Sequence, residues 1–144
     1  AGARRPDSAG TVLFASLANH NAISEAHGNI AASKMMAEVA RVTSETIRTS
    51  DMLAKVEDDQ FCLLLPQTAS ANLPIVLVNL NKHLAQASVR AGEVDLRPEL
   101  DVSYVTYPLE KRTADEVLAL ENRTSMGRLS EVAEAFAAEE GLEE

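Results

Sequence analysis

Two neighbouring polar segments hold the side chains whose types and spacing could support chemistry. Arg48 and Asp51 form a cation–anion pair three residues apart, directly before an apolar run. A few residues later, Glu57-Asp58-Asp59-Gln60 brings three carboxyl groups together. Carboxylate oxygens are hard ligands of the kind that Mg²⁺ prefers, whereas an arginine–aspartate pair can donate to and accept from a ligand. The sequence therefore offers two candidates: metal chemistry at the acidic segment, or ligand binding at the pair before it.

A predicted β-hairpin follows the cation–anion pair and holds the acidic segment at its turn. Residues 52–56 and 61–65 are largely apolar runs of strand length, and a polar turn separates them. We call residues 57–61 the tip of this hairpin and residues 48–51 its shoulder. The spacing thus places the acidic segment at a turn and the cation–anion pair at the start of the first arm.

The rest of the chain predicts the elements that must position the hairpin. Apolar residues of 30–48 and of 73–87 recur every three or four positions, which indicates amphipathic helices, the second with Pro74 in its first turn. Gly28 favours a turn before the first of them. Thr113 and Glu116 have the spacing of a capping box. Further expected elements are strands at 11–17, 93–96 and 100–107, and helices at 21–26, 113–120 and 129–138.

Composition sets the size and class of the molecule. With 144 residues the chain is expected to form one domain with a real core, and because aromatics are only 3% and Trp is absent, aliphatic side chains and Met must fill it. The predicted organisation is a linker at 1–10, a domain at 11–128 and an acidic Ala/Glu-rich tail at 129–144.

Charge and cysteine content limit the partners. The net charge is −9, and six of the glutamates lie in residues 131–144, where Lys and Arg are absent. Such a chain is a poor DNA or RNA binder, because that role needs clustered cations. One cysteine, no signal-peptide pattern and no long apolar run favour a cytoplasmic location without membrane contact for this fragment. His20, His27, His83 and Cys62 lack metal-ligand spacing, and Asn122-Arg123-Thr124 matches the glycosylation pattern without any sign of secretion.

The element order and the hairpin together resemble the GGDEF family, the diguanylate cyclase domain named after Gly-Gly-Asp-Glu-Phe at its tip. The resemblance covers roughly residues 12–120. It implies an α/β nucleotidyl-cyclase-like sandwich: a central mixed sheet with a mid-sheet β-hairpin, flanked by helices. On this pattern the tip reads Glu57, Asp58, Asp59, Gln60 and Phe61.

The resemblance also implies that the tip is degenerate. Two family glycines that let the backbone approach a nucleotide are replaced by Glu57 and Asp58, which add bulk and negative charge. Cyclases also use a carboxylate at the end of the first strand to hold a divalent metal, and that position falls on Ser16. We therefore expect no catalysis, no metal and no resident cofactor.

The shoulder fits the family better. Many members carry an inhibitory Arg-x-x-Asp site five residues before the tip, which binds cyclic di-GMP, and Arg48-Thr49-Ser50-Asp51 meets this offset. The guanidinium can fork onto a phosphate or guanine, and the carboxylate can accept from guanine N–H groups. Because the letters also occur at Arg4 with Asp7 and at Arg112 with Asp115, only the offset is informative. Without a ligand, the pair would be a helix-end cation and an ordinary turn aspartate.

A second anchor and the resulting function follow from the same resemblance. Members that bind cyclic di-GMP between two domains often use an Arg on the next helix; here that position falls near Asn79, with Lys82 one turn on as a point charge. The sequence thus predicts a non-catalytic cyclic di-GMP receptor that relays binding to an unidentified effector protein, with a homodimer possible. The alternative is a dimerisation or docking domain that has lost both nucleotide sites.

Overall fold

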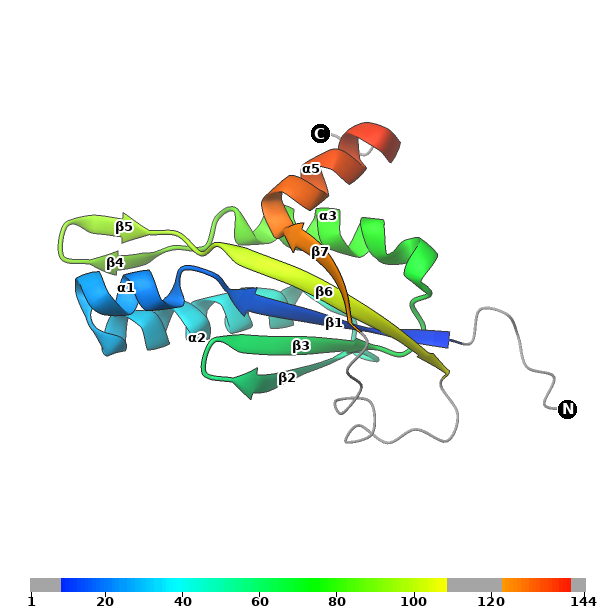
Figure 1. Ribbon diagram of the computed structural model, residues 1–144, viewed down its shortest axis with the longest axis horizontal. Helices are drawn as coiled ribbons and strands as arrows, with labels where there is room; N and C mark the ends of the chain where they lie inside the picture. Colours follow the sequence, from blue (N-terminus) through cyan, green and yellow to red (C-terminus); the bar gives the residue numbers. More distant parts are fainter. Residues whose placement is uncertain (1–8, 109–122, 141–144) are drawn as a thin grey trace, which may run out of the picture.

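A five-stranded antiparallel sheet forms the centre of the molecule (Figure 1). This computed structural model describes residues 9–108 and 123–140. The strand order is β2-β3-β1-β6-β7. The strands are β1 (Ala9–Leu17), β2 (Met52–Glu57), β3 (Gln60–Leu65), β6 (Leu100–Pro108) and β7 (Thr124–Arg128).

The α/β sandwich and the hairpin of β2 and β3 confirm the expected fold class, but two details differ. In place of a mixed sheet, every pairing among the described strands is antiparallel. The reason is that β3, the returning arm of the hairpin, inserts between β1 and β2, so two strands that run in the same direction never become neighbours. The hairpin also lies at the edge of the sheet and not in its middle, with β2 outermost.

Helices α2 (Asn29–Thr46) and α3 (Leu73–Leu84) pack on one face of the sheet (Figure 1). Their apolar positions meet Leu13, Leu63 and Val102, which alternate along their strands toward this face. Pro74 lies in the first turn of α3, where its missing N–H has no intrahelical partner to lose. The shorter α1 (His20–His27) precedes α2, and Gly28 joins them with φ of 98°. Both amphipathic helices predicted from periodicity are confirmed within a few residues.

The opposite face of the sheet has a smaller buried cluster. Val12 and Phe14 of β1 contact Cys62 and Leu64 of β3, and all four are at most 9% exposed. Burial raises the pKa of the Cys62 thiol from its ordinary value of 9.0 to about 11, which the positive charge of Arg123 opposes in part. This cysteine is therefore an apolar core residue at neutral pH, not a nucleophile.

The ends of the domain depart from the predicted boundaries. Ala9 and Gly10, expected in the linker, pair with β6 at the start of β1. The expected tail, residues 129–144, begins with helix α5 (Leu129–Glu140), whose Leu129 and Ala133 are buried at 3% and 2% exposure. An apolar stripe on this otherwise acidic helix therefore packs against the domain, although the composition of the segment is that of a tail. Residues 1–8, the helix expected at 113–120, Asn122 and the other two Arg-x-x-Asp copies lie outside the described residues.

Three short elements complete the described chain. β4 (Val89–Ala91) and β5 (Val94–Leu96) form a separate two-stranded sheet joined through Gly92, whose φ is 64°. A 3-10 turn, η2 (Ser70–Asn72), leads from the hairpin into α3. No helix in the described part of the chain has the length and apolar character needed to cross a bilayer.

Candidate functional site

The shoulder is a tight turn between α2 and β2. Helix α2 ends when Ile47 takes an extended conformation, and the amide of Asp51 donates to the Arg48 carbonyl at 3.0 Å. The Asp51 carboxylate bonds back, because its Oδ2 accepts from the Arg48 amide at 3.0 Å. The side chain of Asp51 thus closes the turn in which it lies, as aspartate commonly does.

The guanidinium of Arg48 forks onto the same carboxylate. Nε donates to Oδ2 at 3.2 Å and Nη2 donates to Oδ1 at 3.0 Å, a bidentate pair. The two partners differ in exposure: the Asp51 side chain is 4% exposed and the Arg48 side chain 54%. The hydrogen bonds that Arg48 donates to Asp51, together with the negative charge of that carboxylate, raise the pKa of Arg48 above its ordinary value. Asp51 therefore lies within the fold while the cation meets solvent.

Thr68 contributes a third bond that the sequence did not reveal. Its hydroxyl accepts from Arg48 Nη2 at 2.9 Å, and its carbonyl accepts from the buried Thr11 hydroxyl at 2.6 Å. Thr68 is 5% exposed and follows β3, twenty residues after Arg48. Sequence spacing holds no signal for this contact, since it depends on where the end of β3 meets the end of α2.

Arg48, Asp51 and Asn79 line one groove of about 420 Å³ between the shoulder and α3. The expected juxtaposition of Asn79 with the pair is therefore present, whereas Lys82 does not line this groove. Apolar side chains form much of the remaining lining: Ile47, Leu63, Leu65, Ile75, Val76 and Leu80. The other polar residues of the lining are Thr46, Gln67, Thr68 and Asn72. A groove that combines apolar and polar groups has the size of a small-molecule site, about 300–1,000 Å³.

The tip is arranged differently. Glu57 pairs with Gln60 across the two-residue turn Asp58-Asp59, and the Asp59 carbonyl accepts from the Leu17 amide at 2.7 Å. Gln60 donates through Nε2 to the Ser16 hydroxyl at 2.8 Å. Phe61 turns into the core at 2% exposure.

Arg123 approaches the tip from the far end of the chain. Its Nη1 lies 3.5 Å from Gln60 Oε1, and its guanidinium carbon lies 3.5 Å from the ring centroid of Phe14. This cation–π contact was missed, because the sequence drew attention to Arg123 only through the glycosylation pattern.

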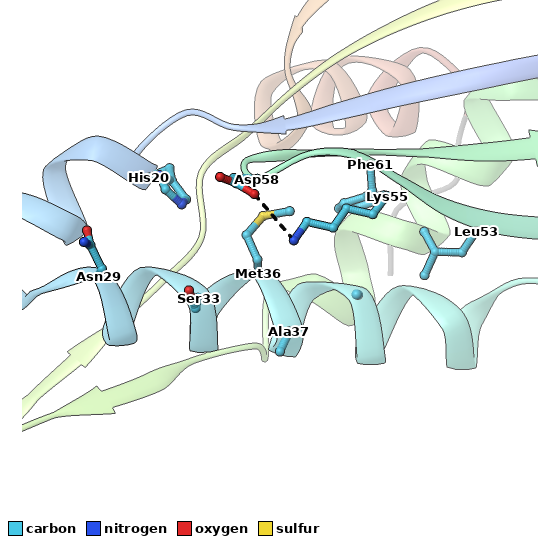
Figure 2. A pocket seen from close by; sticks show the side chains of 10 residues that line it. His20, Asn29, Ser33, Met36, Ala37, Leu53, Lys55, Asp58 and Phe61 are labelled. Atoms are coloured by element: carbon cyan, nitrogen blue, oxygen red, sulfur yellow. Dashed lines mark ion pairs between the residues drawn. The ribbon is translucent and has the colours of Figure 1, made fainter. Parts of the chain in front are cut away.

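A second pocket, of about 660 Å³, lies between the tip and the first turns of α2 (Figure 2). Figure 2 shows His20, Asn29 and Ser33 along one side and Lys55 with Asp58 on the hairpin side. The Lys55 ammonium lies 3.8 Å from Asp58 Oδ1, and both side chains are largely exposed, at 66% and 96%. An exposed pair at this distance contributes little to stability.

The donor set at the tip does not fit the divalent metal that cyclisation needs. Ser16, at the strand-end position, is neutral, and its oxygen accepts from Gln60 Nε2 at 2.8 Å, which leaves Asp59 as the single carboxylate that the resemblance assigns to a metal. Within residues 9–108 and 123–140, no three His, Cys, Asp or Glu side chains come together in a metal-binding group.

Sequence and structure comparisons agree with this architecture. The family model described as "Diguanylate cyclase, GGDEF domain" matches residues 1–126. The chain belongs to the GGDEF family.

Among relatives of this GGDEF domain is the bifunctional diguanylate cyclase/cyclic di-GMP phosphodiesterase MucR of Pseudomonas aeruginosa, 25% identical over 114 residues. That match covers 79% of this chain but only 16% of the relative. The solved structure of diguanylate cyclase SiaD with its activator SiaC, also from Pseudomonas aeruginosa, has a TM-score of 0.68 at 18% identity and covers 92% of this chain and 49% of that one. The GGDEF domain of DgcB from Caulobacter crescentus, in complex with cyclic di-GMP, has a TM-score of 0.64 at 11% identity and covers 92% and 72%.

Proposed function

We propose that this GGDEF domain is a degenerate, non-catalytic receptor that binds cyclic di-GMP at Arg48 and Asp51 and relays binding to a protein partner. The observation that carries the proposal is that the pair lines a partly apolar groove that Asn79 also lines. The family offset of five residues before the tip selects the same two residues. A relative is named for making and degrading cyclic di-GMP, and a structural neighbour was solved with it bound.

Arg48 supplies the principal contact in this proposal. Of its five N–H groups, those on Nε and Nη2 serve Asp51 and Thr68, whereas Nη1 takes part in none of these bonds. The guanidinium can therefore offer Nη1 to a phosphate or a guanine edge without leaving Asp51. Its 54% exposure keeps it within reach of solution.

Asp51 has a different role in the proposal. Both of its oxygens already accept from Arg48, and its side chain is 4% exposed. It therefore acts first by holding the guanidinium, and accepting from guanine N–H groups would need a shift of the turn. The apolar lining of the groove, including Leu63 and Val76, suits a purine face.

Several features of the tip support the absence of catalysis. Exposed Glu57 and Asp58 stand where the family has glycine, and they bring negative charge to a site that would hold a triphosphate. At the end of β1 the neutral pair of Ser16 and Gln60 occupies the place of a metal-binding carboxylate.

Calorimetry with cyclic di-GMP tests the receptor role. We expect micromolar binding by the wild type and a loss of roughly ten- to hundredfold in Arg48→Ala, because charge-assisted hydrogen bonds disappear. Arg41→Ala is the matched control, since Arg41 lies on α2 just before the shoulder, pairs with Glu38 and Glu45, and is absent from the groove. No heat at millimolar ligand would contradict the proposal and favour the docking alternative.

Incubation with GTP and Mg²⁺ tests the catalytic part separately. We expect neither cyclic di-GMP nor pyrophosphate, with an active family member as positive control. Any cyclic product that forms in proportion to enzyme concentration would show that Ser16 and Glu57 do not prevent catalysis.

A further inference from the structure

We propose that Thr68 is a positioning residue of the shoulder site: it fixes the Arg48 guanidinium over the groove and is itself fixed by Thr11 of β1. This inference rests on the proposed function, because it assigns a role in the same site. It also extends that function by connecting the ligand-binding arginine to the first strand of the sheet.

Thr68 is held in place independently of Arg48. Its amide donates to the Leu65 carbonyl at 3.1 Å, and its carbonyl accepts from Thr11 Oγ1 at 2.6 Å. Thr11 is fully buried and Thr68 is 5% exposed, so water competes little for these bonds. The hydroxyl of Thr68 therefore presents a nearly fixed acceptor.

Arg48 needs an acceptor outside its own turn, and the Thr68 hydroxyl is one. Asp51 is three residues away in the same turn, so its bonds orient the guanidinium only relative to the shoulder itself. Thr68 belongs to the segment after β3, outside the shoulder turn, and lines the same groove. Its bond to Nη2 connects the shoulder turn to the segment that follows β3.

The bond to Thr68 also determines which N–H groups of Arg48 remain available to a ligand. One N–H of Nη2 donates to Asp51 and the other donates to Thr68. These two bonds orient the plane of the guanidinium and leave both N–H groups of Nη1 for a ligand. Preorganising a long side chain in this way lowers the entropy lost on binding. Thr68 thus raises affinity without touching the ligand.

Thr68→Val tests the proposal, because valine keeps the shape and the carbonyl but lacks the hydroxyl. We expect calorimetry to show cyclic di-GMP binding weakened roughly three- to tenfold, the factor that corresponds to loss of order in one long side chain. Thr68→Ser restores the hydroxyl and is expected to bind within about twofold of the wild type. The heteronuclear NMR signal of Arg48 Nε–H should broaden or shift in the valine variant and return in the serine variant, with or without ligand.

Thr43→Val is the matched control. Thr43 is fully buried on α2, its hydroxyl has no hydrogen-bond partner within the described part of the chain, and it does not line the groove. The affinity of this variant should equal that of the wild type. If the wild type binds and folded Thr68→Val binds equally well, the positioning role is wrong while the receptor function stands. If the wild type does not bind at all, both are wrong.

Discussion

The shoulder and the tip each hold an acidic residue three positions after a cation, yet the two ion pairs differ in almost every physical respect. Arg48 and Asp51 meet at 3.0 Å with the carboxylate 4% exposed. Lys55 and Asp58 meet at 3.8 Å with the carboxylate 96% exposed. The shoulder pair has two guanidinium nitrogens on two oxygens and a bond from the backbone, whereas the tip pair has a single contact between point charges.

This difference shows that spacing does not determine what an ion pair does. A buried carboxylate must be satisfied by fixed donors, so its partners are ordered and become part of the fold. An exposed carboxylate is satisfied by water, so its lysine partner stays free to move. A ligand site is expected where the ordered cation reaches solvent, which occurs at the shoulder.

Removing the two cations gives the largest difference between the regions. We expect Arg48→Ala to lower the free energy of unfolding by about 1–3 kcal/mol, because Asp51 loses donors in a buried place. Lys55→Ala should stay within about 0.5 kcal/mol of the wild type, as exposed substitutions usually do. Urea unfolding followed by circular dichroism measures both. Equal losses for the two variants would break the comparison.

A smaller effect on the free energy of unfolding distinguishes the burial of a hydroxyl from its hydrogen bonding. Thr43 is as buried as Thr68, but its hydroxyl has no partner within residues 9–108 and 123–140. Thr43→Val should therefore leave the unfolding free energy unchanged or raise it by up to about 1 kcal/mol, because an unsatisfied polar group leaves the core. The same urea titration measures it. A clear loss of stability would mean that burial alone makes a hydroxyl valuable here.

Much of the fold could be predicted from the sequence because periodicity is a local signal. The steps of three and four residues identified α2 and α3, and the paired apolar runs identified the hairpin. Strand β7 was missed because its residues, Thr124-Ser125-Met126-Gly127-Arg128, lack an apolar alternation. Its place at the sheet edge comes from pairing with β6 and from Arg128, which donates to Asp101 at 2.7 Å.

The site could be predicted only in part. The offset from the tip selected Arg48 and Asp51, and the structure brings Asn79 to the same groove. The burial of Asp51 and the bond to Thr68 could not be predicted, because both depend on how the end of β3 packs beside the end of α2. The spacing of residues along the sequence identifies neighbours within one helix or strand. It does not identify a hydrogen-bond acceptor that another part of the fold contributes.

Strand β2 has a consequence for self-association. It is the outermost strand on its side of the described sheet, with Met52 57% exposed, and such an edge can template the addition of a further strand. The register shift between Lys55 and Glu57 interrupts the hydrogen-bond ladder there, and Lys55 adds an exposed charge. The bulge near the tip and the charge of Lys55 are both features that disfavour edge-to-edge pairing.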